Sequence, residues 1–506
     1  MSSPMDPRPA DVHDTALIAE VRPSDWVNPT PVGRYNLVVI GGGTAGLVTA
    51  AGAAGLGAKV ALVEKHRLGG DCLNYGCVPS KTLLRAARAA RAVREAGRFG
   101  VRVPPGTTVD FAAVMERVRA VRAGISHHDS AARFRDLGVD VFLGEGRFVD
   151  GSTLAVGTAR LRFKRAVIAT GARAHVPSVP GLAEAGFLTN ETVFSLTVLP
   201  ARLAVIGGGP IGCELAQAFA CLGAEVTLFE PGDHLLSRED ADAAAVVQTA
   251  LTRDGVRLRL GSKVEKVEVG SGGRLIRHHT GSGVATTEVD AILVATGRAP
   301  NVRGLGLEEV GVRYDERNGV AVDDHLRTTH PRIFAAGDVC MAAKFTHAAD
   351  FAARTVIQNA LFFGRKKASA LTLPWCTYTE PELAHVGLSE RSAAERGVAV
   401  DTFVRPLSEV DRAVTEGERE GFVKILVARG TDRIVGATIV SPHAGDLISE
   451  VAVAMAGGIG LGKLAAVIHP YPTLAEAIRQ CGDAYNRTRL TPGVRRLFEA
   501  WLRWTR

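Results

Sequence analysis

Two cysteines, Cys72 and Cys77, are separated by four residues in the segment GGDCLNYGCVPSKTLL, residues 69–84, just before a run typical of a helix. A Cys near a helix N-terminus meets the positive end of the helix dipole and unsatisfied N–H groups, so its thiolate is favoured. Such a sulfur donates and accepts electrons readily, and we interpret the pair as redox-active. Two alternatives stay open from the spacing alone: reduced structural cysteines, or half of a zinc site.

A zinc site would require a second close pair of ligands. The remaining cysteines are scattered singly along the chain: Cys213, Cys221, Cys340, Cys376 and Cys481. His127 and His128 are adjacent but have no partner ligands nearby in the sequence. We therefore expect no metal site, while the redox and the structural interpretations of the pair both stay open until the rest of the chain is considered.

A glycine-rich turn precedes the cysteines. Residues 35–40 read as a buried strand, followed by a small-residue helix and a second strand that ends at Glu64. Gly41, Gly43 and Gly46 form GxGxxG, in which the first glycine allows the turn, the second admits a pyrophosphate, and the third lets helix and strand pack closely. Glu64 is placed to hydrogen-bond a ribose hydroxyl. The pattern predicts a dinucleotide site, and the cysteines directly after it favour a flavin.

The same architecture repeats over residues 201–231. Gly207, Gly209 and Gly212 form a second GxGxxG, and the strand after it ends at Glu230. Two such units predict two cofactors, so the second unit would hold the nicotinamide nucleotide. Glu230 suits a free ribose 2′-hydroxyl and would repel a 2′-phosphate, which slightly favours NADH over NADPH despite the nearby Arg238.

Further glycines follow apolar strands at three places. Gly171 and Gly297 each end an Ala-Thr-Gly sequence, and Gly337 precedes Asp338 in HPRIFAAGDVC. An acid after a strand and a small-residue turn can hydrogen-bond a ribityl or ribose hydroxyl, although it could also cap the next helix. We take these residues as cofactor-binding, with Asp338 returning to the flavin domain.

The chain of 506 residues is too long for one ordinary core, so two to four domains are expected. Its 46% apolar and 22% charged residues are typical of a globular protein. The chain has a net charge of +7, and its basic residues are mostly spread out and have no aromatic-laced basic motif, which favours an anionic cofactor over nucleic acid. No signal sequence or membrane-spanning run is recognisable, and we expect a cytoplasmic protein.

From residue 35 to residue 486 the sequence resembles the flavoprotein disulfide reductases, or pyridine nucleotide-disulfide oxidoreductases, with CLNYGCVPSK, both glycine turns, ATGRAPN and AAGDV in order. The resemblance implies bound FAD and NADH or NADPH. It also implies that Cys77 is the sulfur next to the flavin, that Cys72 is the interchange sulfur that meets the substrate, and that Lys81 and Glu214 form an ion pair beside the flavin.

Disulfide-reducing members carry a His–Glu dyad that moves protons across the dimer interface. Aligned on Pro472 and Glu476 in VIHPYPTLAEA, the catalytic His position holds Tyr471. A phenol titrates near 10 and a free His near 6.5, so Tyr471 is the poorer base at neutral pH. Tyr at this position resembles the mercuric reductase branch, although that branch's N-terminal CxxC domain and C-terminal cysteine pair have no counterpart here. His469 could act as a displaced base, and a structural role is favoured.

The resemblance implies an α/β fold with two Rossmann-like three-layer domains and a C-terminal α+β dimerisation domain. We expect an N-terminal extended arm (residues 1–33), an FAD domain in two parts (34–171 and 300–368), a nucleotide domain (172–299), an interface domain (369–486) and a basic amphipathic tail (487–506). The tail is expected to dock on the partner subunit of a homodimer rather than on a membrane.

The expected function is an FAD-dependent NAD(P)H oxidoreductase that passes electrons to the Cys72/Cys77 disulfide and on to a soft metal ion such as Hg(II). Thiolates prefer soft metals, which favours this acceptor. Reduction of a small disulfide is the alternative. An alternative of another class is a flavin-binding redox sensor or scaffold with little turnover.

Overall fold

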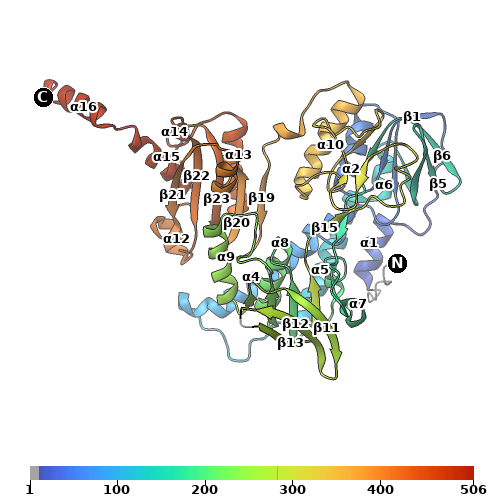
Figure 1. Cartoon of the computed structure of the whole chain (residues 1–506), viewed down its shortest axis with the longest axis horizontal. Helices are drawn as coiled ribbons and strands as arrows, with labels where there is room; N and C mark the ends of the chain where they lie inside the picture. Colours follow the sequence, from blue (N-terminus) through green and yellow to red (C-terminus); the bar gives the residue numbers. More distant parts are fainter. Residues whose placement is uncertain (1–10, 282) are drawn as a thin grey trace. The chain divides into compact units, whose positions relative to one another are not determined.

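The computed structural model describes residues 11–281 and 283–506, and Figure 1 shows the order of its elements along the chain. Internal contacts divide the chain into two compact units, which are described separately. Unit 1 comprises residues 1–207, 218–229 and 263–371, and unit 2 comprises residues 208–217, 230–262 and 372–506. Helix α8 (Pro210–Leu222) crosses the division between them.

The main sheet of unit 1 has the strand order β3-β2-β1-β6-β5-β4, with β18 also paired to β6. Strands β1, β2, β3, β6 and β18 run parallel, whereas β4, β5 and β6 form antiparallel pairs. The bounds are β1 (Arg34–Ile40), β2 (Val60–Glu64), β3 (Val139–Leu143), β4 (Gly146–Asp150), β5 (Thr153–Val156), β6 (Ala159–Ile168) and β18 (Ile333–Ala335).

Strand β1 is buried on both faces, as expected of a parallel strand covered on each side. Leu37 and Val39 face one apolar cluster, whereas Tyr35, Val38 and Ile40 face another. The first cluster includes helix α2 (Thr44–Gly55) and helix α10 (Thr346–Leu361), which lie side by side in Figure 1. The carboxyl end of β1 is thereby fixed, and the first glycine turn begins there.

Unit 1 also holds most strands of the repeated segment. Strands β8 (Arg202–Ile206), β9 (Glu225–Phe229) and β14 (Ala291–Val294) pair in parallel with β8 in the middle. An antiparallel sheet is made of β11 (Val264–Gly270), β12 (Gly273–Thr280) and β13 (Gly283–Val289). The short strand pairs are β7 (Ala172–Ala174) with β15 (Arg298–Pro300), and β16 (Tyr314–Asp315) with β17 (Gly319–Val320).

The remaining helices of unit 1 differ from the sequence-based expectations at two places. These helices are α1 (Val12–Val21), α3 (Gly70–Asn74), α4 (Cys77–Glu95), α5 (Phe111–Ile125), α6 (Ala131–Asp136) and α7 (Leu182–Ala185). The sequence of residues 110–137 predicts a single long helix, and this prediction is wrong, because a 3-10 turn and the Ser130 side-chain cap separate α5 from α6.

The expected extended arm is also wrong over residues 12–21, which form α1. Asp11 caps this helix, and Leu17 and Val21 are buried in the core of unit 1. The buried Arg122 of α5 forms an ion pair with Asp14 of α1 at 2.5 Å. Buried side chains and this ion pair therefore attach α1 to α5, while residues 1–10 lie outside the described part of the chain.

Unit 2 is built on an antiparallel sheet with the order β19-β20-β23-β22-β21. Its strands are β19 (Pro374–Thr377), β20 (Glu382–Gly387), β21 (Val400–Pro406), β22 (Phe422–Ala428) and β23 (Ile434–Ser441), with β10 (Arg257–Arg259) elsewhere in the unit. Its helices are α9 (Ala241–Arg253), α11 (Glu390–Glu395), α12 (Asp411–Glu416), α13 (Ala444–Ala456), α14 (Leu461–Leu464), α15 (Glu476–Thr488) and α16 (Pro492–Trp504). The sequence predicts strands near residues 422–427 and 434–440 and a helix from Ala444, and β22, β23 and α13 confirm all three.

Among the described residues, no helix is both long and apolar enough to cross a membrane.

Candidate active site

The two redox cysteines lie on consecutive helices of unit 1. Cys72 is in α3, and Cys77 is the first residue of α4. Gly76, the N-cap of α4, makes no side-chain capping hydrogen bond, so the helix N-terminus faces the sulfur without a competing acceptor there. Both cysteines are free thiols, and their side chains hydrogen-bond to each other. The predicted helix therefore begins at Cys77 itself.

The surroundings shift the pKa values of the two sulfurs in opposite directions. The hydrogen bond from Cys72 lowers the pKa of Cys77 to about 6, and Thr346 and Lys81 act in the same direction. The Oγ1 atom of Thr346, the first residue of α10, lies 3.2 Å from the Cys77 Sγ. The same hydrogen bond, together with burial, raises the pKa of Cys72. At neutral pH the reduced pair is therefore a Cys77 thiolate beside a Cys72 thiol.

Arg298 joins three parts of this site that are far apart in sequence. Its guanidinium lies 3.2 Å from the Asp71 carboxylate and 3.3 Å from the Asp338 carboxylate. Asn190 also donates to Asp71, at 2.9 Å. Sequence analysis missed Arg298 and Thr346. The available signal for Arg298 was a lone Arg directly after the Ala-Thr-Gly of residues 295–297.

The first glycine turn has the geometry that the sequence predicts. Gly41 has φ +109° and donates its N–H to the Val63 carbonyl at 2.8 Å. A Cβ on Gly46 would lie 1.7 Å from the Gly41 carbonyl oxygen, so only glycine allows α2 to pack this closely. Gly43 is the N-cap of α2 and supplies no side-chain cap, which leaves the helix N-terminus open to a phosphate.

Glu64 lies at the end of β2, as expected. Its two carboxylate oxygens accept the N–H groups of Gly42 at 2.6 Å and His66 at 2.5 Å. Burial raises the pKa of this carboxyl group, and the two hydrogen bonds oppose that rise. Glu64 thus holds the glycine turn, and each oxygen keeps a lone pair that could accept a ribose hydroxyl.

The second turn repeats these contacts. In unit 1, Gly207 has φ +109° and donates to the Phe229 carbonyl at 2.9 Å. In unit 2, Glu230 accepts the N–H of Gly208 at 2.7 Å and that of Gly232 at 2.8 Å. A Cβ on Gly209 would meet nothing within 4 Å, so space beside the start of α8 remains open. Gly212 lies within α8. The internal duplication is therefore structural as well as sequential.

The other predicted cofactor-binding glycines follow strands as expected. Gly171, Gly297 and Gly337 adopt left-handed φ values of +66°, +116° and +80°. Asp338 follows directly, and burial raises the pKa of its carboxyl group while Arg298 and Lys344 lower it. The uncapped N-terminus of α2, the glycine turn and this buried acid together fit a dinucleotide such as FAD.

Lys81 and Glu214, the expected ion pair, lie in different units. Lys81 is one helical turn after Cys77 in α4 and lowers the pKa of that thiol. Glu214 is buried in α8, and its Oε1 accepts the Tyr378 N–H at 2.9 Å. Their pairing stays a prediction.

The proposed proton-transfer residues of unit 2 have separate partners. The exposed Tyr471 donates its hydroxyl to the Asp411 Oδ2 at 2.9 Å, and this bond raises the pKa of the phenol. Glu476 begins α15 and accepts from Arg479 at 2.8 Å. The His469 Nε2 lies 2.8 Å from the Glu450 Oε1, and its Nδ1 lies 3.0 Å from the Val467 carbonyl. With both ring nitrogens engaged, His469 fits the structural role better than that of a free base.

Within residues 11–281 and 283–506, no group of three or more His, Cys, Asp or Glu side chains could hold a metal ion. The rings of His127 and His128 lie against each other at an angle of 43°, with centroids 3.9 Å apart.

Comparison with known proteins gives consistent relatives. The chain is 36% identical to a mercuric reductase of Staphylococcus aureus over 455 residues, covering 90% of this chain and 83% of that protein. It is 34% identical to a dihydrolipoyl dehydrogenase of Bacillus subtilis over 472 residues, covering 89% and 98%. The Cu(II) complex of the HOCl-induced flavoprotein disulfide reductase RclA from Escherichia coli has a TM-score of 0.79 at 28% identity, covering 90% of this chain and 100% of that chain.

Two family descriptions match consecutive parts of the sequence. Residues 35–360 match pyridine nucleotide-disulphide oxidoreductase, and residues 373–481 match its dimerisation domain, which supports a homodimer. The family uses FAD and NAD(P)H. The paired cysteines and the duplicated glycine turns thus lie inside the matched region, and this chain is a flavoprotein disulfide oxidoreductase of the pyridine nucleotide-disulphide oxidoreductase family.

Proposed function

We propose that the chain is an NAD(P)H-dependent reductase of a soft metal ion, with Hg(II) as the leading candidate. The observation that carries the proposal is Tyr471, an exposed phenol at the position where a disulfide reductase needs a His. A bound metal ion requires thiolates but no base that reprotonates a departing thiol. The similarity to mercuric reductases supports the same acceptor.

When bound, FAD would supply the redox chemistry that links hydride transfer from the nicotinamide to reduction of the Cys72–Cys77 disulfide. The chain's own residues prepare that exchange. Lys81, Thr346 and the α4 N-terminus stabilise Cys77 as a thiolate, while Arg298 ties the segment before Cys72 to the turn that holds Asp338. Cys72 remains the thiol that meets the acceptor.

In the metal reaction, the Cys77 thiolate and the Cys72 thiol bind Hg(II), and Cys72 loses its proton. The electron pair that originates from NAD(P)H then reduces the ion to Hg(0), so the net reaction of NAD(P)H with Hg(II) gives NAD(P)+, one proton and Hg(0). Cys72 regains a proton when Hg(0) leaves, and no substrate thiol has to be protonated. The phenol of Tyr471, which we expect to come from the partner subunit, would supply an oxygen ligand that guides the ion.

Several further assignments accompany this proposal. The FAD domain is residues 34–171 and 300–368, the nucleotide domain is 172–299, and the interface domain is 369–486. Glu230 favours NADH, because its carboxylate is fixed beside the second glycine turn by Gly208 and Gly232. We place the protein in the cytoplasm, where a reduced dithiol persists.

Reduction of a small disulfide is the second candidate, supported by the 34% identity to a dihydrolipoyl dehydrogenase. The RclA complex contains Cu(II), and this ion is a further acceptor to test. A redox sensor differs from both, because it would turn over no acceptor.

The experiment measures anaerobic NADH oxidation by the purified holoenzyme with one acceptor at a time. The acceptors are Cu(II), lipoamide, glutathione disulfide and Hg(II), which is buffered by excess thiol. We expect Hg(II) to give the highest rate and Cys72→Ser to abolish it. Cys376→Ser is the matched control, because Cys376 is a partly buried thiol of unit 2 outside the predicted redox pair. Faster turnover of lipoamide would refute the metal proposal, and rapid flavin reduction without reoxidation by any acceptor would indicate a sensor.

A further inference from the structure

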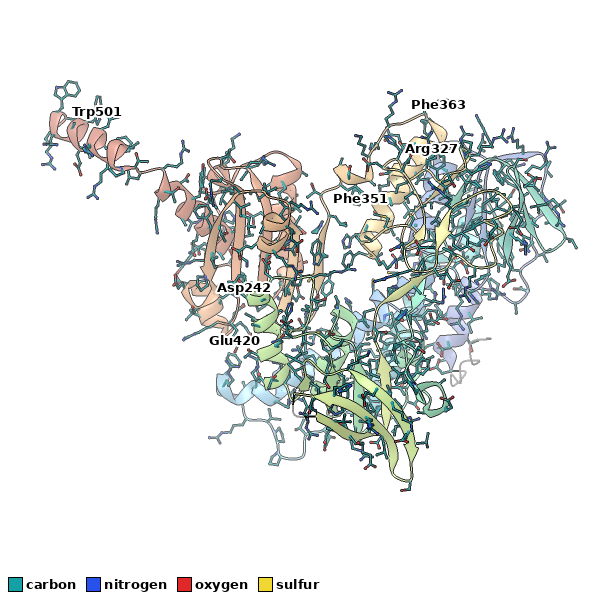
Figure 2. The ribbon with its side chains drawn as sticks, viewed as in Figure 1. Asp242, Arg327, Phe351, Phe363, Glu420 and Trp501 are labelled. Atoms are coloured by element: carbon teal, nitrogen blue, oxygen red, sulfur yellow. The ribbon has the colours of Figure 1, made fainter. Side chains whose placement is uncertain are left out.

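Helix α16 presents large apolar side chains to solvent. No residue of this helix is buried. Its five large hydrophobic residues are between 53% and 77% exposed: Leu497, Phe498, Trp501, Leu502 and Trp504. Figure 2 marks Trp501, which is 59% exposed, near the end of the chain. Such a concentration of exposed aromatic and aliphatic groups indicates an interaction surface.

These residues all lie on one side of the helix. At 3.6 residues per turn, Val494 and the five large residues occupy a stripe of about 160°, whereas the four charged residues of α16 occupy the rest. Those charged residues are Arg495, Arg496, Glu499 and Arg503. Thr491 caps the helix by accepting from the Val494 N–H, and Pro492 occupies the first turn, so the segment is well suited to start a helix here.

The segment also carries most of the chain's net charge. Residues 487–506 contain six Arg and one Glu, a net +5, whereas the whole chain has +7. The other 486 residues therefore contribute only +2. A second copy of this chain consequently offers no net negative charge to attract the tail, but an anionic lipid surface does.

We propose that α16, in place of the docking on the partner subunit expected from the sequence, binds the surface of an anionic membrane, lying in the plane of the interface with its apolar face among the acyl chains. Trp and Phe favour this depth, and Arg side chains can extend to the phosphates. The helix does not span the bilayer, because its 13 residues reach only about 20 Å and the hydrocarbon core is about 30 Å thick. This inference is independent of the acceptor that the active site reduces.

The test is flotation of the full-length holoenzyme with vesicles of phosphatidylcholine alone or with about one third phosphatidylglycerol. We expect the protein to bind the anionic vesicles at least tenfold more tightly than the neutral ones. High salt should strongly reduce this binding, because salt screens the attraction between the Arg side chains and the lipid phosphates. The double variant Trp501→Ser/Trp504→Ser should lose at least tenfold in binding. Arg496→Gln and Arg503→Gln should each weaken it about fivefold.

Matched controls lie outside α16. Phe363 is 86% exposed and Arg102 is exposed, so Phe363→Ser and Arg102→Gln remove comparable groups from other surfaces. Both should bind vesicles like the wild type, and all variants should keep the wild-type rate of NADH oxidation. Equal binding to neutral and anionic vesicles would overturn the proposal. The proposal would also be overturned if the wild type failed to bind vesicles and the Trp501→Ser/Trp504→Ser protein lost dimer stability in analytical ultracentrifugation. In that case α16 would dock on a second copy of the chain.

Discussion

Cys77 and Cys72 are chemically identical residues whose surroundings separate their roles. Cys77 begins α4 and receives hydrogen bonds from Cys72 and Thr346, and the Lys81 ammonium lies one turn further on. Cys72 donates, and therefore retains its proton. This asymmetry makes Cys77 the resting thiolate, and we propose Cys72 as the sulfur available to an acceptor.

The first prediction concerns that division of roles. Anaerobic two-electron reduction of the holoenzyme should produce a long-wavelength absorbance band that depends on the Cys77 thiolate. Cys77→Ser should abolish the band, whereas Cys72→Ser should show it without any reductant. Wild-type spectra and turnover in both single variants would show that the redox pair has been misassigned.

The second prediction concerns the pH dependence of the same band. The pKa of Cys77 is lowered to about 6, so the thiolate persists above that pH and is lost below it. The long-wavelength absorbance of the reduced enzyme should therefore fall as the pH is lowered, with a midpoint near pH 6. Because the Lys81 charge lowers this pKa, Lys81→Met should move the midpoint to higher pH. Arg85→Met, at an exposed position one turn further along α4, should leave it unchanged. A midpoint that stays in place in Lys81→Met would contradict the electrostatic argument.

The third prediction concerns Glu230 and nucleotide choice. Its carboxylate should repel a 2′-phosphate, so the kcat/KM for NADH should at least equal that for NADPH. Glu230→Gln keeps one acceptor oxygen but removes the charge, and should shift the ratio toward NADPH by about tenfold, or about 1.4 kcal/mol. Glu225→Gln, at the exposed start of β9, is the control. A wild-type kcat/KM clearly higher for NADPH would show that the NADH assignment is wrong.

Residues with local signals could be predicted from sequence, and those defined by tertiary contacts could not. Cys77, Gly41 and Glu64 each occupy a fixed place in a short motif. Arg298 reaches Asp71 across more than two hundred residues of chain, and Thr346 reaches Cys77 from a different helix. No spacing rule encodes such contacts, because they depend on how the strands of the sheet are ordered.

At the scale of elements, the two glycine turns require glycine for two different reasons, which are close packing at one position and ligand access at another. Gly46 is needed because α2 packs against the turn before it, and a Cβ there would clash with the Gly41 carbonyl. Gly209 has open space around its Cβ position. Within the structure, only the first of these is a packing requirement.

The fourth prediction follows from this difference. Gly46→Ala should destabilise the protein by about 1–3 kcal/mol, as overpacking does, and reduce the amount of bound FAD. Gly209→Ala should leave the Tm nearly unchanged but raise the KM for the nicotinamide nucleotide, because a methyl group would occupy the approach of the pyrophosphate. Thermal unfolding and steady-state kinetics measure the two effects. Equal losses of stability in both variants would refute the distinction.

The elements themselves were predicted best where a periodic pattern had clear ends. β1 and β2 end close to the expected residues, and α13 begins at Ala444. The break between α5 and α6 was missed because helix-forming residues flank the polar stretch of residues 126–130 on both sides, and Ser130 caps the next helix. The helix at residues 12–21 was missed because composition alone was weighed, although Asp11 is a standard N-cap residue.

At the scale of the whole molecule, duplication and dimerisation determine the function. The family uses FAD and NAD(P)H, which we expect the repeated turns to bind, and the C-terminal sheet belongs to the part that matches a dimerisation domain. The order of the two family matches along the chain was predictable, since both glycine motifs precede the dimerisation segment. The electron acceptor was not, because it depends on a residue expected to act across the dimer interface.

The last prediction concerns that residue, Tyr471. If the acceptor is a metal ion, Tyr471→Phe should slow its reduction while leaving flavin reduction by NADH unchanged, since the phenol acts only after the electrons reach the cysteines. Tyr471→His should raise activity on lipoamide or another small disulfide, because general base catalysis contributes typically about 100-fold to 10,000-fold. Glu476 is paired with Arg479, so the full gain requires the carboxylate to turn toward the new imidazole, and Arg479→Gln in the same chain should increase it.

Asp411 provides the matched control for this residue. Its carboxylate accepts the Tyr471 hydroxyl, so Asp411→Asn should remove the negative charge beside the phenol and lower the pKa of the phenol without removing the ring. Metal reduction should then be retained in Asp411→Asn and slowed in Tyr471→Phe. Efficient wild-type turnover of a disulfide that falls in Tyr471→Phe would instead show that the phenol donates protons, and that the acceptor is a disulfide rather than a metal ion.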